Sequence, residues 1–337
     1  MRLSRKAPKL SSRAYARRRA LGFFLRLLTV VNLLGLFGAL GCANPVLEPT
    51  SEYQKQAMLA QANIYLSTGN CAGAIALMDA LYNSGFTDND VRMVRASAHG
   101  CNAGINFLPL VDKLGTANIA GPLLWRRLTE YFPYSSDSNL QSAWYATDSL
   151  MAALLPGVVI AAADEFNAGT LNPGSLKYTQ RTSDSNLYMI FVSMANIGQI
   201  QNKRGAPDGN YQKTQNLPGT TSATVTEEGC SYAGSILNMI EGISATSTLM
   251  SGSVATSLTQ LTTVFDALLK DACGKGCAGT AGSGCTLTYA ECAVSCPIKL
   301  RTRTGCTNAA LTDAQNPAKC AASGIINFIN TDPFGWN

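Results

Sequence analysis

The distribution of the eleven cysteines constrains this 337-residue chain more than any other feature of its sequence. Cys42 stands alone near the N-terminus, and ten cysteines follow it, an even number that can pair completely. Disulfides persist in oxidising compartments outside the cytosol. We therefore expect an exported protein whose ten downstream cysteines form disulfides: Cys71, Cys101, Cys230, Cys273, Cys277, Cys285, Cys292, Cys296, Cys306 and Cys320.

Residues 1–41 have the layout of a secretory signal. They contain nine basic residues and no acidic residue, and a short apolar run extends from Leu27 to Leu40. That run is shorter than the roughly 20 residues of a membrane-spanning helix. A basic region, a short apolar region and small residues before a cleavage point are typical of a signal peptide. The alternative is an uncleaved N-terminal helix with a buried Cys42.

The sequence Ala39-Leu40-Gly41-Cys42 resembles the lipobox of bacterial lipoproteins. In that family the leader is removed before the cysteine, here between Gly41 and Cys42, and a diacylglycerol is attached to the cysteine sulfur. The resemblance implies a membrane anchor at Cys42. Ala43 stands where an aspartate would favour the inner membrane, so the resemblance implies the outer membrane.

Removal of the leader reverses the net charge of the protein. The precursor has 26 basic and 21 acidic residues, a net charge of +5. Without the nine basic residues of the leader, 17 basic residues face all 21 acidic ones, a net charge of −4. A basic surface is the usual electrostatic footprint of nucleic-acid binding. We therefore expect no nucleic-acid partner.

The mature chain divides into three parts and is expected to be all-α. Residues 42–52, which include Pro45 and Pro49, are expected to form a lipidated tether. Helical periodicity dominates residues 53–272, and residues 273–337 form a cysteine-rich segment. Beyond a break at 68–70, Thr87 and Asp90 resemble a helix cap. Later helices are expected at 138–154, 157–168, 185–202, 229–241 and 253–272, with a long mobile loop at 203–227.

Residues 58–86 resemble one tetratricopeptide repeat, which pairs two helices in 34 residues. Ala62, Tyr65, Ala74 and Met78 occupy small and aromatic positions of that family. The resemblance implies antiparallel helical hairpins stacked as a bundle or solenoid; an ordinary hairpin is the alternative. Because the start of one antiparallel helix lies beside the end of the next, a Cys71–Cys101 disulfide is geometrically sensible.

The C-terminal cysteines contain two Cx3C pairs, Cys273 with Cys277 and Cys292 with Cys296. This arrangement resembles twin-Cx3C helical hairpins, and the resemblance implies Cys273–Cys296 and Cys277–Cys292 bridges. Zinc binding is the alternative, but the sequence has no Cx2C pair and only one histidine. We therefore expect disulfides here, and no metal or other cofactor.

The sequence contains no recognisable catalytic motif, and we do not expect an enzyme. His99 is the only histidine, and no nucleophile motif accompanies it, which favours a structural role. Asp164 and Glu165 follow an apolar run and are candidates for carboxylate chemistry, but we favour the alternative that they mark a helix end emerging into solvent. Six aromatic residues can line a groove or fill a core: Trp125, Tyr131, Phe132, Tyr134, Trp144 and Tyr145.

These features favour a lipid-anchored scaffold or adaptor on the periplasmic side of a Gram-negative outer membrane. Helical-repeat surfaces commonly bind proteins or peptides. The first alternative is a ligand-binding accessory component of a solute transporter, which leaves room for a small-molecule ligand. The second is a cell-wall hydrolase that uses Glu165. An enclosed apolar cavity between the helices would favour the transporter component, and a filled core would favour the adaptor.

Overall fold

The computed structural model describes residues 51–106, 110, 124–153, 181–246, 312, 316–331 and 336. These residues contain eight α-helices. In chain order they are α2 (Glu52–Ser67), α3 (Cys71–Asn83), α4 (Asn89–Asn102), α6 (Leu124–Tyr131), α7 (Asp137–Met151), α9 (Ser183–Gly205), α10 (Glu227–Thr246) and α13 (Pro317–Asn330). The described residues include no β-strand, which confirms the expected all-α class. All of them belong to the unit Pro49–Asn337.

Short polar side chains start the first three helices. The Ser51 hydroxyl accepts a hydrogen bond from the Gln54 N–H at 3.3 Å, and the Asn70 side chain accepts one from the Gly73 N–H at 3.0 Å. Asp88 caps α4, because its carboxylate accepts from the Val91 N–H at 3.3 Å. These bonds satisfy N–H groups that have no partner within the helix. The expected cap at Thr87 is wrong by one residue, since Thr87 lies outside the capping position.

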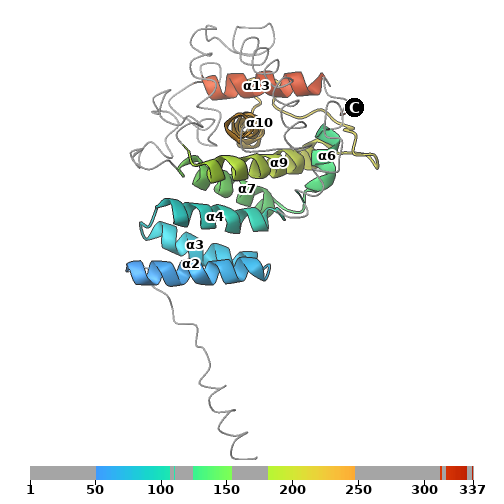
Figure 1. Ribbon diagram of the computed structural model, residues 1–337. Coiled ribbons are helices and arrows are strands. Elements are labelled where there is room, and N and C mark those ends of the chain that lie inside the picture. The colour runs from blue at the N-terminus through green and yellow to red at the C-terminus, as the bar shows by residue number, and fades with distance from the viewer. Residues whose placement is uncertain are drawn as a thin grey trace, which may run out of the picture. The chain divides into compact units, whose positions relative to one another are not determined.

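A disulfide fixes the antiparallel order of α3 and α4. Cys71 at the start of α3 is bonded to Cys101 near the end of α4, with their Cα atoms 5.5 Å apart. This bond confirms the pairing that the sequence favoured. Figure 1 shows α2, α3, α4 and α7 packed one against the next in chain order. Between α4 and α7, the Asn102 amide donates to the Ser142 hydroxyl at 2.7 Å.

Helix α9 is the centre of the hydrophobic core. Every side chain from Met189 to Gln201 is buried, and α6, α7 and α10 all pack against this helix. A helix that is buried on all sides is typical of a protein core. Gly198 permits the close approach of α6, since a Cβ at this position would lie 2.2 Å from the Leu128 carbonyl oxygen.

The aromatic residues around α6 and α7 mostly fill the core. Trp125 and Phe132 are buried, and Tyr131 and Trp144 pack against the core from partly buried positions. The Trp144 indole N–H donates to the Asn196 side-chain oxygen at 3.0 Å. These four residues therefore contribute to the hydrophobic core, which was one of the two roles expected for them, and they do not line a groove.

The loop between α9 and α10 is tied to the C-terminal part of the chain. The Lys213 N–H donates to the Trp336 carbonyl at 2.8 Å. The Asn330 side chain bonds both backbone groups of Leu217, with each distance 2.9 Å. The loop was expected to be mobile, but these hydrogen bonds attach it to the C-terminal part of the chain. Local composition does not reveal such partners, because they lie more than a hundred residues away in sequence.

Three of the later helices expected from the sequence are confirmed, and two lie in segments that the structure does not describe. The expected helices at 138–154, 185–202 and 229–241 correspond to α7, α9 and α10. Helix α13 was not expected within the cysteine-rich segment. The expected helices at 157–168 and 253–272 lie outside the described residues. No described helix is both long enough and apolar enough to span a membrane.

Four of the ten downstream cysteines lie in the described residues. Besides Cys71 and Cys101, Cys230 and Cys320 are each disulfide-bonded and buried. The expected signal with its cleavage point at Gly41, the expected lipid-attachment residue and the other six cysteines lie outside the described residues: Cys42, Cys273, Cys277, Cys285, Cys292, Cys296 and Cys306.

Candidate functional site

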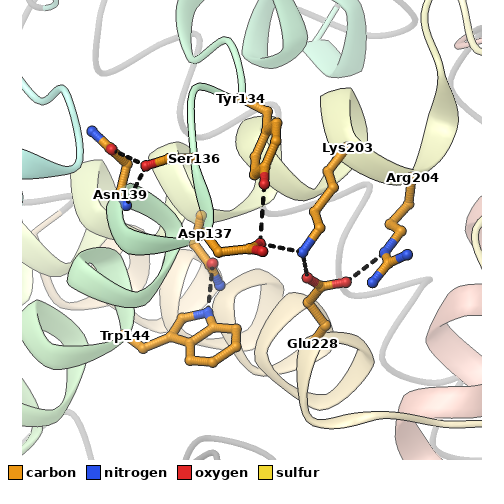
Figure 2. Close-up of polar contacts among 9 residues, drawn as sticks. Tyr134, Ser136, Asp137, Asn139, Trp144, Lys203, Arg204 and Glu228 are labelled. Atoms are coloured by element: carbon orange, nitrogen blue, oxygen red, sulfur yellow. Dashed lines mark hydrogen bonds and ion pairs between the residues drawn. The ribbon is translucent and has the colours of Figure 1, made fainter.

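A chain of ion pairs joins the ends of α7, α9 and α10 (Figure 2). The Lys203 ammonium lies 2.5 Å from the Asp137 carboxylate and also contacts one oxygen of Glu228. Arg204 Nε lies 2.5 Å from the other oxygen of Glu228. We call Asp137, Lys203, Arg204 and Glu228 the ionic junction. It links three helices through one shared carboxylate and one shared ammonium.

Helix direction explains why these charges meet. Asp137 and Glu228 lie in the first turns of α7 and α10, and Lys203 and Arg204 lie in the last turn of α9. Acidic side chains are favourable at helix N-termini and basic ones at C-termini because of the helix dipole. Since α9 runs antiparallel to both neighbours, the two kinds of helix end are brought together.

The ionic junction is arranged to hold charge. Burial lowers the pKa of Lys203, but hydrogen bonds to Asp137 and Glu228 outweigh it and raise the pKa above the ordinary value. The hydrogen bond from Lys203 lowers the pKa of Asp137. The Tyr134 hydroxyl lies 3.1 Å from Asp137, and the Lys203 ammonium lies 5.5 Å from the Tyr134 ring centre. A carboxyl that acts as a general acid needs a raised pKa, so the junction favours charge recognition over acid catalysis.

A shallow pocket lies beside the ionic junction. Arg204, Glu228 and Thr226 contribute its polar part, and its apolar part comes from Ile200, Leu217, Pro218, Tyr232 and Ile326. Its free volume is about 10 Å³, which is room for about one water molecule. The pocket can therefore accept the tip of a side chain, and it cannot enclose a metabolite.

The only histidine belongs to a second polar cluster, between α3, α4 and α7. His99 Nε2 lies 3.1 Å from Asp79 Oδ1, and Arg95 Nε lies 2.7 Å from the same oxygen. Arg95 also donates to the Ser149 hydroxyl at 2.7 Å. In the described part of the chain, no serine or cysteine is hydrogen-bonded to His99. The cluster therefore fits a structural role for this residue.

Arg95, on α4, contacts side chains of both α3 and α7 in this second cluster. Its guanidinium lies 4.5 Å from the Tyr82 ring centre and 5.7 Å from that of Tyr145. Burial raises the pKa of Asp79, but the hydrogen bond from His99 and the charge of Arg95 outweigh it, and the net pKa is lowered. The aspartate is therefore charged at neutral pH, and it holds α4 to α3.

The sequence singled out His99 and several aromatic residues, but it did not identify the ionic junction. Lys203, Arg204 and Glu228 lie at or beside the borders of the segment 203–227, which was expected to be a mobile loop. The available signal was a basic pair, Lys203-Arg204, followed by an acidic pair, Glu227-Glu228, at the two ends of that segment.

The sequence also raised a carboxylate pair and a metal site as candidates. Asp164 and Glu165 lie outside the described residues. Among the described residues, no group of three or more histidine, cysteine, aspartate or glutamate side chains is placed to bind a metal ion. Comparison of the chain with protein-family models, curated proteins and solved structures finds no match.

Proposed function

We propose that the mature protein is a lipid-anchored scaffold or adaptor of a Gram-negative cell envelope. It is held at Cys42 on the periplasmic side of the outer membrane, and its stacked helices bind protein or peptide partners. The signal at residues 1–42 supports export and lipidation. The Cys71–Cys101 disulfide supports an oxidising compartment.

The small volume of the pocket beside the ionic junction is the observation that carries the binding role. A pocket for a small molecule typically has roughly 300–1,000 Å³ of space. The pocket beside the ionic junction has about 10 Å³, and α9 buries every residue from Met189 to Gln201. Among the described residues, this favours an adaptor over a component that carries a small solute. The stack from α2 to α4 supports a repeat-like arrangement of hairpins.

The ionic junction and its pocket are the face that we assign to the partner. Arg204 is 42% exposed in its side chain, whereas Glu228 is 11% exposed. The junction therefore presents a cation that is already oriented by its bond to Glu228. A partner side chain placed in the adjoining apolar pocket would provide a buried anchor, the arrangement found at binding hot spots.

Site-specific photo-cross-linking in cells tests this assignment. A photoreactive residue at Thr226, which is exposed at the rim of the pocket, is expected to form an adduct with one envelope protein or peptide. The same residue at Asn83, which is exposed at the end of α3, is the matched control. The adduct should weaken in Arg204→Ala. Equal capture from both positions, or none from Thr226, would contradict the proposed binding face.

Membrane fractionation tests the proposed anchor separately. Cys42→Ser should move the protein from the membrane fraction to the soluble periplasmic fraction, because no thiol remains for the diacylglycerol. Retention of the variant in the membrane fraction would refute anchorage at this residue. Mass spectrometry without reduction should find no free thiol among the ten later cysteines.

A further inference from the structure

The outer face of α2 exposes apolar side chains to a degree that no other described helix matches. Three large apolar side chains are exposed in the described part of the chain: Tyr53 at 85%, Ile64 at 55% and Tyr211 at 41%. Two of the three lie on α2. The opposite face of α2 buries Met58, Leu59 and Ala62. This helix is therefore apolar on two sides, of which one is covered by the rest of the fold.

Four apolar residues form a continuous stripe on the outer face of α2, of which Ala57 is half-buried and the other three are exposed. Tyr53, Ala57, Ala60 and Ile64 are spaced at i, i+4, i+7 and i+11, which places them along one side of a helix. The stripe is about 16 Å long at 1.5 Å per residue. The two alanines at its centre have short side chains, so a second helix can approach the backbone closely there.

This stripe, which we call the α2 stripe, is complementary to itself. Its residues are symmetric about the midpoint between Met58 and Leu59. When a second copy of α2 lies antiparallel across that midpoint, Tyr53 faces Ile64 of the other copy, and Ala57 faces Ala60. Two-fold symmetric interfaces require this reciprocity, because the same patch is used on both chains.

The charges of α2 are compatible with such a pair. The α2 stripe is uncharged, and uncharged Gln56, Gln61 and Asn63 flank it. Lys55 is 8% exposed and is bound to Glu52 at 2.7 Å and Asp88 at 3.0 Å. Glu52 lies at one end of the helix, so the two copies would hold this acid at opposite ends of the pair. No like charges are brought together along the contact.

We propose that the α2 stripe is a self-association surface through which two copies of this chain pair antiparallel. The contact involves one helix of 16 residues from each copy, which is less than the roughly 1,600 Å² of a standard stable interface. The dimer is therefore weak and depends on concentration. Confinement of the copies to one membrane surface, as in the proposed function, raises their effective concentration. Pairing would make the adaptor bivalent.

Photo-cross-linking from within the α2 stripe tests the proposal in cells that produce the full chain. Tyr53 is replaced by benzoylphenylalanine, which keeps an aromatic ring at this position. The expected product has twice the mass of the chain, and its cross-link maps near Ile64 of the second copy. The same replacement at Asn83 is the control and should give no such product. A cross-link only to another protein, or only within one chain, would overturn the proposal.

A charge rescue tests the antiparallel register. Ala60→Arg places two arginines close together across the midpoint, and Ala57→Glu does the same with two glutamates. Each single variant should reduce the yield of the dimer product at least about tenfold, because like charges in an interface are strongly unfavourable. The double variant A57E/A60R should restore the yield, since each glutamate then faces an arginine of the other copy. Undiminished yield in the single variants, or no recovery in the double variant, would refute this pairing.

Discussion

Arg95 offers the sharpest test of the packing described above, because one side chain holds three helices together. Arg95→Met removes the ion pair with Asp79 at 2.7 Å, the hydrogen bond to Ser149 at 2.7 Å, and the stacking on Tyr82 and Tyr145. Loss of one partner of a buried ion pair costs about 3–5 kcal/mol. The Asp79 side chain is 34% exposed, so water can partly solvate it. We therefore expect a loss of about 2–4 kcal/mol in the free energy of unfolding.

A double-mutant cycle separates the ion pair from the loss of packing. Urea denaturation with the disulfides intact is followed by circular dichroism for wild type, Arg95→Met, Asp79→Asn and the double variant. We expect a coupling energy of about 1–2 kcal/mol between the two residues. The stability of Arg95→Lys should fall between those of wild type and Arg95→Met. Lysine keeps the positive charge but lacks the planar guanidinium, which can donate several hydrogen bonds in a fixed geometry. Additivity of the two single changes within about 0.5 kcal/mol would refute the claim that this pair holds α4 to α3.

The remaining predictions concern the covalent bond, a helix contact and acid stability. Replacement of Cys71 and Cys101 by alanine should lower the free energy of unfolding by about 3–4 kcal/mol, because the bond closes a long loop in the unfolded chain; an unchanged urea midpoint would contradict this. Gly198→Ala should cost about 1–3 kcal/mol, because its methyl group would clash with a backbone carbonyl of α6. Gly209→Ala, where a Cβ meets nothing within 4 Å, is the control and should change the melting temperature little. The lowered pKa of Asp79 stabilises the fold above the ordinary aspartate pKa, near 4, and this contribution is lost as the pH falls through the lower folded value. Asp79→Asn should therefore be less sensitive than wild type to acidification below about pH 4.

Several local features could be predicted from the sequence because their causes are local. Apolar spacing and the break at 68–70 indicated the helices at the start of the described chain, and Asn70 and Gly69 do lie at the turn between α2 and α3. The Cys71–Cys101 bond was also favoured by the expected antiparallel arrangement of adjacent helices. Errors of one residue, as at the cap of α4, arise because neighbouring polar residues can each serve as a cap.

The ionic junction could not be predicted in this way. Its residues come from three helices, and the distance from Asp137 to Lys203 is 66 residues along the chain. Periodicity indicates which face of a helix is apolar, but it does not indicate which helix ends become neighbours. The same limit applies to Asp79 and Arg95, because their ion pair depends on the packing of α3 against α4.

The sequence by itself determined the helical class, the break between the first two helices and the pairing of one disulfide. These properties depend on spacing within one helix or between adjacent ones. The tertiary structure alone decided that α9 is the buried centre, that the loop after it is bound to Asn330 and Trp336, and that four charges meet beside a small pocket. Such contacts depend on the way that distant helices pack, and they are set by the burial of apolar surface over the whole chain.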